Sequence, residues 1–272
     1  MLKNVYIETY GCQMNVADSE VVASILKNEG YEICNDASEA DLILINTCSI
    51  RDNAEKKVLA RGRELQAIKN KKPHLRIGII GCMAERLNET LFEKLTDIDL
   101  LAGPDSYKKL PILLREVENF KKASDVILST SETYEDISPE HYQTGNITAF
   151  VSIMLGCNNF CSYCVVPYTR GRERSRPVKS IIKEIEVLEK KNFTEITFLG
   201  QNVNSYNFFY GIEKYDFPAL LVLTAKSFPN LRLRFATSHP KDPSENLVQV
   251  IATHNNIFKS IHLSVQSGSY IL

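Results

Sequence analysis

The stretch LILINTC, residues 42–48, decides the fold of the first half of the chain. Four consecutive apolar residues that run into a polar pair and a cysteine are typical of a parallel strand buried on both faces. A similar stretch, GIIGC, spans 78–82, and the strand expected over Val5–Thr9 is followed by Cys12. Segments of helical periodicity, such as 18–29, separate these strands. The alternation predicts an α/β fold with an open, doubly wound parallel sheet. Helices are expected over 18–29, 51–69, 85–95 and 106–120.

The second half of the chain repeats the strand–helix alternation after a polar stretch. We expect an N-terminal domain over 1–120, a linker over 121–146 with a strand near 126–128, and a second domain over 147–272. A closed (β/α)₈ barrel needs about 250 residues, so the second domain is predicted to be a partial (β/α) barrel. Its strands are expected over 150–155, 195–199, 231–237 and 261–265.

Composition narrows the class of protein. Of 272 residues, 44% are hydrophobic and 24% charged, and the net charge is −1, which excludes a uniformly basic nucleic-acid coat. No apolar run reaches the length of a membrane span, and the first residues enter a strand pattern instead of a signal peptide. We therefore expect a cytoplasmic protein with no membrane partner, in which cysteines serve metal binding or catalysis.

Three of the seven cysteines form a compact motif, Cys157-x₃-Cys161-x₂-Cys164. Thiolates are soft ligands that suit iron–sulfur clusters or zinc. Three thiolates can hold three irons of a [4Fe–4S] cube and leave the fourth iron open, whereas ferredoxin-type carriers use four cysteines in a different spacing. A zinc site completed by a distant histidine is the weaker alternative, because no second ligand pair is present.

A second group of cysteines becomes visible only through the predicted sheet. Cys12, Cys48 and Cys82 each follow a predicted parallel strand, at the edge where open α/β sheets place their sites. Three residues that are far apart in sequence are thus expected to converge on a second metal group. The alternative is that they are ordinary buried cysteines, which is our interpretation of Cys34.

Several stretches resemble one family closely. The motif around Tyr163 is similar to the radical S-adenosylmethionine signature. The longer matches point to the methylthiotransferases that make 2-methylthio-N6-isopentenyladenosine in tRNA. They are ETYGCQMN (8–15), NTCSIRDNAEKK (46–57), GIIGCMAER (78–86), CSYCVVPYTRGRERSRP (161–177), LGQNVNSY (199–206) and HLSVQSGS (262–269). The resemblance covers essentially the whole chain.

The resemblance implies two [4Fe–4S] clusters and S-adenosylmethionine as cofactors. Cys157, Cys161 and Cys164 would be both metal ligands and catalytic, holding the cluster that binds and reductively cleaves S-adenosylmethionine. Cys12, Cys48 and Cys82 would hold an auxiliary cluster that supplies the sulfur. A methylthio group would then replace the hydrogen at C2 of the adenine at position 37, beside the anticodon.

The family also implies contacts to the two other molecules of the reaction. Cofactor contacts are expected at Tyr163, Gly200, Gln201, Asn202, Ser238, Gln266 and Ser267. Some of these could instead form polar turns at strand ends. Alternating arginines at 170, 172, 174 and 176 are expected to bind phosphates of the tRNA anticodon stem-loop. An electron donor such as flavodoxin or ferredoxin is implied, and the protein is expected to be a monomer.

Two departures from the family pattern shape the expectations. Ser264 stands where the family has proline, and family members continue beyond the residue that matches Leu272. The chain is therefore expected to be a C-terminally truncated form that binds both clusters but turns over poorly. The alternatives are a methylthiotransferase for a ribosomal protein or for threonylcarbamoyladenosine in tRNA, and a non-enzymatic iron–sulfur or zinc module that binds RNA.

Overall fold

The computed structural model describes residues 3–49, 52–120, 122–142 and 147–263. They group into two compact units, which are described separately. The first unit comprises Met1–Glu132, Ile137–Tyr142 and Asn158–Arg172, and the second comprises Thr133–Asp136, Gln143–Cys157 and Glu173–Leu272. None of the helices in the described ranges is long and apolar enough to cross a membrane.

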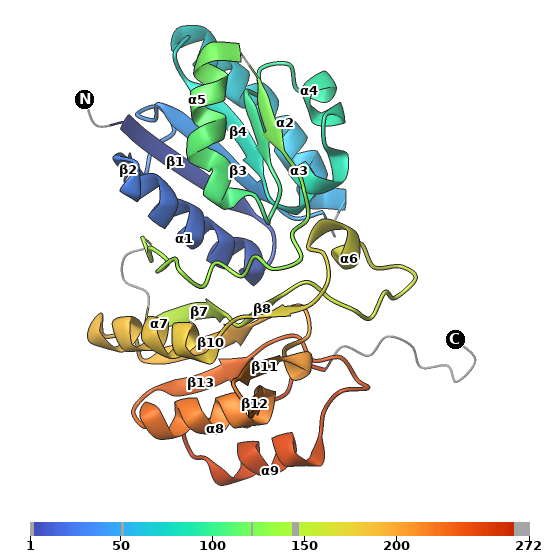
Figure 1. Ribbon diagram of the computed structural model, residues 1–272. Coiled ribbons are helices and arrows are strands. Elements are labelled where there is room, and N and C mark those ends of the chain that lie inside the picture. The colour runs from blue at the N-terminus through green and yellow to red at the C-terminus, as the bar shows by residue number, and fades with distance from the viewer. Residues whose placement is uncertain (1–2, 50–51, 121, 143–146, 264–272) are drawn as a thin grey trace. The chain divides into compact units, whose positions relative to one another are not determined.

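The first unit is built on a six-stranded, all-parallel sheet (Figure 1). Its strands are β1 (Lys3–Tyr10), β2 (Tyr31–Ile33), β3 (Leu42–Thr47), β4 (Arg76–Ile80), β5 (Leu100–Ala102) and β6 (Ala123–Asp125). All six residues of β3 are buried, as the continuous apolar run predicts for a central strand covered on both faces. The predicted doubly wound parallel sheet is confirmed.

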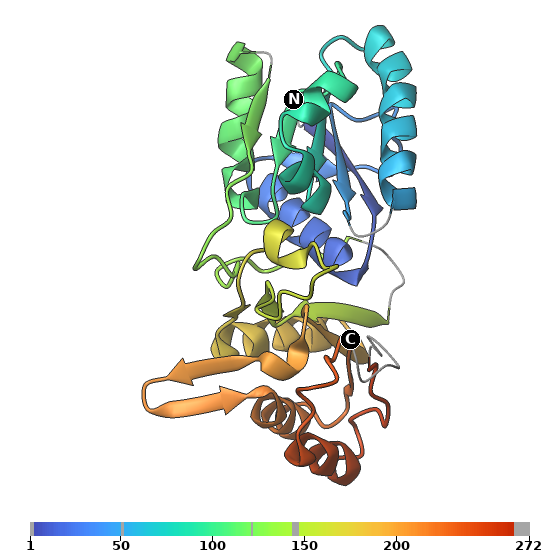
Figure 2. The same cartoon turned by 90° about the vertical axis from the view of Figure 1, so that its right-hand side faces the viewer.

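Helices cover both faces of this sheet, as the two views in Figures 1 and 2 show. The helices are α1 (Gln13–Asn28), α2 (Asp52–Lys71), α3 (Cys82–Leu87), α4 (Thr90–Lys94), the 3₁₀ turn η1 (Tyr107–Lys109) and α5 (Leu110–Phe120). The buried side chains Ile43, Ile77 and Ile79 of the sheet pack with Val58 and Leu65 of α2. This apolar contact packs α2 against the central strands of the sheet.

The strand order β2-β1-β3-β4-β5-β6 places a topological switch point between β1 and β3. The chain moves from β1 to one edge of the sheet for β2 and then returns to the other side of β1 for β3. In open α/β sheets, ligands bind at the carboxyl ends of the strands beside such a switch point. Cys12 and Cys48 follow the two strands that flank it, and Cys82 follows the next strand, β4.

The second unit contains a three-stranded parallel sheet in the order β13-β10-β7. The strands are β7 (Thr148–Ser152), β10 (Glu195–Leu199) and β13 (Arg232–Phe235), and the helices are α7 (Val178–Lys190), α8 (Phe217–Ser227) and α9 (Glu245–Thr253). Ile181 and Ile185 of α7 and Phe198 of β10 are fully buried in one core. Strand–helix units in sequential order are those of a partial (β/α) barrel, as predicted.

Shorter elements complete both units. Strands β8 (Met154–Leu155) and β9 (Arg174–Ser175) form an antiparallel pair, strands β11 (Asn207–Tyr210) and β12 (Glu213–Asp216) form a hairpin, and η2 (Val203–Ser205) is a 3₁₀ turn. The single turn α6 (Val166–Thr169) belongs to the first unit. The hairpin was not predicted from the sequence; Tyr206, just before it, is buried, whereas Phe209 and Tyr210 on its first strand are exposed.

Some predicted elements differ from the structure. The helix expected over 85–95 is divided into α3 and α4, because Asn88 adopts a positive φ of 47°. The strand expected near 126–128 lies at Ala123–Asp125 and forms the sixth strand of the sheet, inside the expected linker. Of the strand expected over 261–265, the described residues form a single bridge between Ser238 and Leu263. The domain limits at 120 and 146 stay a prediction.

Candidate metal centres

The structure brings Cys12, Cys48 and Cys82 together at the carboxyl edge of the first sheet. The Cys12 and Cys48 side chains share a hydrogen bond. The Cys82 thiol lies close enough to Cys12 for the charge of Cys12 to raise the pKa of Cys82. The backbone explains the approach, because the Cys48 N–H donates to the Tyr10 carbonyl oxygen at 2.9 Å and thereby aligns the ends of β1 and β3. Three thiols from three strand ends therefore form one group.

Two glycines make this convergence possible. A Cβ atom at Gly11 would lie 2.3 Å from Asn15 Oδ1 and 2.9 Å from the Cys48 Cβ, closer than any side chain tolerates. Gly81 adopts a φ of +90°, and a Cβ there would lie 2.5 Å from Asn46 Oδ1. Only glycine fits these close approaches without strain.

Two asparagines form a hydrogen-bonded pair next to the thiols. Asn15 Nδ2 donates to Asn46 Oδ1 at 3.0 Å, and Asn46 Nδ2 donates to the Asn15 carbonyl oxygen at 2.8 Å and to Ser19 Oγ at 2.9 Å. Asn15 Oδ1 accepts the Cys12 N–H at 3.2 Å, which fixes the turn into α1. The sequence analysis missed this pair, although polar residues beside the cysteines were a usable signal.

The electrostatic surroundings favour a thiolate at one position. The hydrogen bond with Cys48 and the positive charge of Arg170 lower the pKa of Cys12 to about 6, against the opposing effect of burial. Burial raises the pKa of Cys82, while Arg170 opposes that shift. Since the thiolate is the form that binds metal, the lowered pKa favours the metal-binding form of Cys12.

The second triad begins in one unit and ends in the other. Cys157 is buried and follows β8 and Gly156 in the second unit, whereas Cys161 and Cys164 lie in the Asn158–Arg172 segment of the first unit. The Cys164 N–H donates to the Cys161 carbonyl oxygen at 2.9 Å, which closes a turn between these two ligand positions.

Neither cysteine triad has the arrangement of side chains that binds a single metal ion. Within the described residues, no group of three histidine, cysteine, aspartate or glutamate side chains forms such a site, and no disulfide joins any of the seven cysteines, all of which are described. The donor chemistry is what fits an iron–sulfur cluster, because each set supplies three soft sulfur ligands.

Polar groups at the strand ends of the second unit form a separate set. Asn202 follows β10 and is buried, where its Nδ2 donates to Asp242 at 2.6 Å and its Oδ1 accepts the His239 N–H at 3.2 Å. The buried atoms Gln201 Oε1 and Ser238 Oγ have no hydrogen-bond partner among the described residues. Unsatisfied buried polar atoms of this kind are suited to a polar ligand.

The remaining predicted cofactor contacts lie in different surroundings. Gly200 lies against Met154, and a Cβ there would be 2.5 Å from the Met154 Cγ. Tyr163 is exposed, in the same segment as Cys161. Gln266 and Ser267 lie outside the described residues.

The predicted phosphate-binding arginines do not form one exposed row. Arg170, Arg174 and Arg176 are buried, and only Arg172 of the four is exposed. Arg176 pairs with Glu184, and its Nε donates to Ser180 at 3.0 Å. Alternation along the sequence did not place these side chains on the surface, because packing and ion pairs bury three of them.

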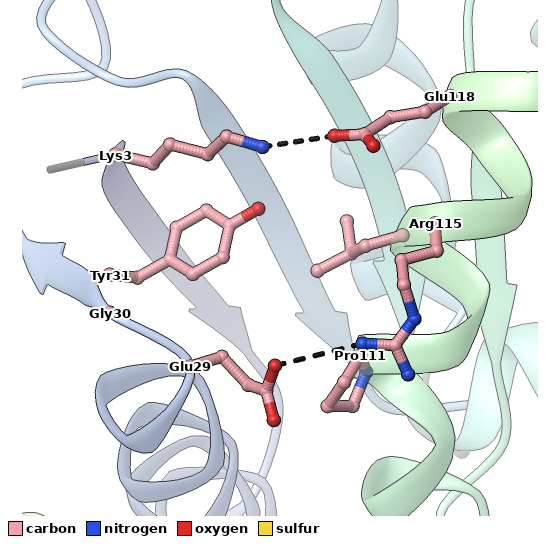
Figure 3. A pocket seen from close by; sticks show the side chains of 8 residues that line it. Lys3, Glu29, Gly30, Tyr31, Pro111, Arg115 and Glu118 are labelled. Carbon is pink, nitrogen blue, oxygen red and sulfur yellow. Dashed lines mark hydrogen bonds and ion pairs between the residues drawn. The ribbon is translucent and has the colours of Figure 1, made fainter. Parts of the chain in front are cut away.

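A pocket of 250 Å³ lies elsewhere in the first unit, between β1, β2 and α5 (Figure 3). It is lined partly by Lys3 and Glu118, which pair at 2.9 Å, and by Glu29 and Arg115, which pair at 3.8 Å. Lys3 begins β1, whereas Cys12 follows its end, so this pocket lies at the opposite end of the strands from the thiols.

Comparison with known proteins identifies both parts of the chain. Residues 4–103 match the uncharacterized protein family UPF0004, and residues 151–271 match the radical SAM superfamily. Two solved structures of the radical S-adenosylmethionine methyltransferase TsrM from Kitasatospora setae share the fold. One aligns with a TM-score of 0.64 and 15% identity over 92% of this chain and 57% of that chain. The chain thus combines an α/β domain with a partial radical SAM fold.

High identity in sequence is found with proteins named tRNA-2-methylthio-N(6)-dimethylallyladenosine synthase. Those of Parabacteroides distasonis and Bacteroides fragilis are both 55% identical over 98% of this chain, and that of Porphyromonas gingivalis is 52% identical over 98%. The chain spans 58% of the length of each of these relatives. This similarity to the synthases extends over nearly the whole chain and agrees with the resemblance of the sequence motifs.

The lowered pKa of Cys12 gives a first prediction. In the metal-free protein, kept reduced, we expect alkylation of Cys12 by iodoacetamide to rise around pH 6, because its thiolate is stabilised by Cys48 and Arg170. Cys34 should react only at higher pH, since burial raises its pKa above 9.0. Peptide mass spectrometry across pH 5 to 10 measures both sites. Cys48→Ala should move the Cys12 profile upward; identical profiles for Cys12 and Cys34 would contradict the assignment.

Glu85 gives a second prediction, which concerns stability. Burial, followed by the charges of Asp105 and Asp125, raises the pKa of Glu85 from 4.5 to about 8. Because the folded-state pKa is raised, its favourable contribution exists below pH 4.5 and is lost as pH rises through about 8. Glu85→Gln should therefore match the wild type at pH 4.5 and be the more stable protein at pH 9.

The measurement is urea unfolding followed by circular dichroism between pH 4.5 and 9. The control is Glu118→Gln, because the hydrogen bond from Lys3 lowers the pKa of Glu118 and confines its effect to lower pH. A stability difference between wild type and Glu85→Gln that stays constant with pH would show that this carboxyl group does not titrate in the range.

Proposed function

We propose that the protein acts as a radical S-adenosylmethionine methylthiotransferase on tRNA. It would insert a methylthio group at C2 of N6-isopentenyladenosine at position 37, next to the anticodon. The observation that carries the proposal is the pair of cysteine triads, one convergent at the switch point of the first sheet and one in the C-x₃-C-x₂-C motif. High identity to the named synthases supports the substrate, and a tRNA substrate would place the protein in the cytoplasm.

Each triad has a distinct role in this proposal. Cys157, Cys161 and Cys164 would hold a [4Fe–4S] cluster at which S-adenosylmethionine binds, and Cys12, Cys48 and Cys82 would hold a second. When bound, these groups supply one-electron reduction of the cofactor and the sulfur to be transferred. The protein contributes the ligands, their orientation and a buried setting: Cys48 and Cys82 are almost fully shielded from solvent.

The strand ends of the second unit supply the proposed cofactor contacts. Gln201 Oε1 and Ser238 Oγ, which lack partners among the described residues, can accept or donate to the polar groups of S-adenosylmethionine. Asn202 is held by Asp242 and orients the turn after β10. Tyr163 and Gly200 complete the set, and Gln266 and Ser267 stay predicted contacts.

The remaining partners follow from the same proposal. Arg172 is the one member of the arginine run with the exposure that a phosphate contact needs. A flavodoxin or ferredoxin would supply the electron, and the protein would act as a monomer.

Iron content tests the two metal groups. Anaerobic reconstitution should give about eight irons and a similar amount of acid-labile sulfide per chain, because two cubic clusters are expected. The triple variants Cys12→Ala/Cys48→Ala/Cys82→Ala and Cys157→Ala/Cys161→Ala/Cys164→Ala should each retain about four. Cys34→Ala is the matched control and should retain all of them. Stoichiometric zinc in place of iron would favour a non-enzymatic RNA-binding module.

Cleavage of S-adenosylmethionine tests the division of labour. With dithionite, wild type should release 5′-deoxyadenosine, Cys157→Ala should release none, and Cys12→Ala should still release it but should not methylthiolate an anticodon stem-loop RNA. The expected asymmetry arises because only one triad would bind the cofactor. Methylthiolation by Cys12→Ala would refute the role of the second triad. Modification of a threonylcarbamoyladenosine RNA or of a ribosomal protein, in preference to the isopentenyl substrate, would shift the proposal to a related methylthiotransferase.

A further inference from the structure

A buried ion pair lies within the first unit, next to the thiols of Cys12, Cys48 and Cys82. Arg170 Nη2 donates to Asp18 Oδ2 at 2.5 Å and Arg170 Nη1 donates to Asp18 Oδ1 at 3.4 Å, a two-pronged contact. The Tyr107 hydroxyl donates to Asp18 at 3.3 Å. Arg170 is 3% exposed and Asp18 is 6% exposed, so the pair is shielded from water and salt.

The two partners come from distant parts of the chain. Asp18 lies on α1, one and a half turns after Cys12, whereas Arg170 directly follows α6 in the segment that also carries Cys161 and Cys164. Residues of α6 also lie against α3, which begins at Cys82. The segment Asn158–Arg172 is thereby grouped with the sheet of the first unit and not with the barrel strands that precede and follow it in sequence.

Arg170 also reaches the thiols themselves. Its guanidinium group makes a hydrogen bond with Cys82, and its charge acts on Cys12. A guanidinium group has five N–H donors in a fixed fork, so it can serve the carboxylate and a sulfur at the same time. It remains charged at any physiological pH.

We propose that Arg170 is a positioning residue that serves both cysteine sets. Through Asp18 it anchors the segment that bears Cys161 and Cys164, and through its contact with Cys82 it places a fixed positive charge against the Cys12, Cys48 and Cys82 set. The charge role rests on the proposed function, which assigns a cluster to those cysteines. The anchoring role does not depend on any metal.

The charge of Arg170 predicts the direction in which the reduction potential of the cluster shifts. Reduction adds a negative charge to a cluster, so a nearby fixed cation stabilises the reduced form and raises the reduction potential. Loss of the Arg170 charge should lower the potential. Loss of the Asp18 charge should raise it, because Asp18 offsets part of the positive charge. A purely structural role would not produce opposite shifts from the two partners.

The potential can be measured on the N-terminal cluster alone. In the full chain carrying Cys157→Ala/Cys161→Ala/Cys164→Ala, we would follow reduction by electron paramagnetic resonance in an anaerobic titration. Arg170→Gln should lower the potential, Asp18→Asn should raise it, and Arg170→Lys, which keeps the charge, should stay near the parent. Arg176→Gln is the matched control, since it breaks an equally buried arginine–carboxylate pair with Glu184 and should leave the potential unchanged.

The anchoring role is measured without metal. In the apo protein, hydrogen–deuterium exchange of residues 158–172 should become faster in Arg170→Gln and in Asp18→Asn, and stay unchanged in Ser162→Ala, which alters an exposed side chain of the same segment. Unchanged exchange in both anchor variants would overturn the anchoring role.

The outcomes distinguish the charge role of Arg170 from its anchoring role. Shifts of the same sign from Arg170→Gln and Asp18→Asn, or an equal shift from Arg176→Gln, would overturn the charge role while leaving the cluster itself intact. A parent protein that binds no iron after reconstitution would overturn the proposed second cluster and the charge role with it, and the exchange measurement would still decide whether Arg170 anchors the segment.

Discussion

The structure depends on one constraint, the parallel pairing of β1 with β3 and of β3 with β4. Parallel strands carry their carboxyl ends to one edge, and the return of the chain across β1 opens a switch point there. Every residue that follows these strands is brought to the same place. The convergence of Cys12, Cys48 and Cys82 is therefore a consequence of topology, and the buried apolar run of β3 secures it.

Ordinary polar contacts surround the thiols at this edge. Asn15 donates a hydrogen bond to Asn46 next to the thiols. Gly11 and Gly81 lack the Cβ atoms that would collide with the neighbouring side chains. The buried Arg170 places a positive charge next to Cys12 and Cys82, and this charge opposes the effect of burial on the pKa of both thiols. Because Asp18 balances that arginine, the positive charge can be buried without being left unpaired.

The sequence was informative wherever a local pattern has a single structural meaning. The continuous apolar runs predicted the parallel strands, and helical periodicity predicted α2 within two residues at each end, whereas α1 begins at Gln13, five residues before its expected start. It was less informative where two structures share one pattern. The helix expected over 85–95 was broken by a positive φ at Asn88, and the alternating arginines read as a surface row when three of them are buried.

By itself, the sequence determined the fold class and the two cysteine sets, because strand periodicity and cysteine spacing are local properties of the chain, and its motifs carried the family resemblance. Only the tertiary structure decided that Asn15 pairs with Asn46, that Asp18 binds Tyr107 and Arg170, and that Arg170 belongs with the first sheet. The Asp18–Arg170 pair joins positions 152 residues apart. No local pattern encodes such a contact, since its partners are selected by the packing of the sheet and not by their neighbours in sequence.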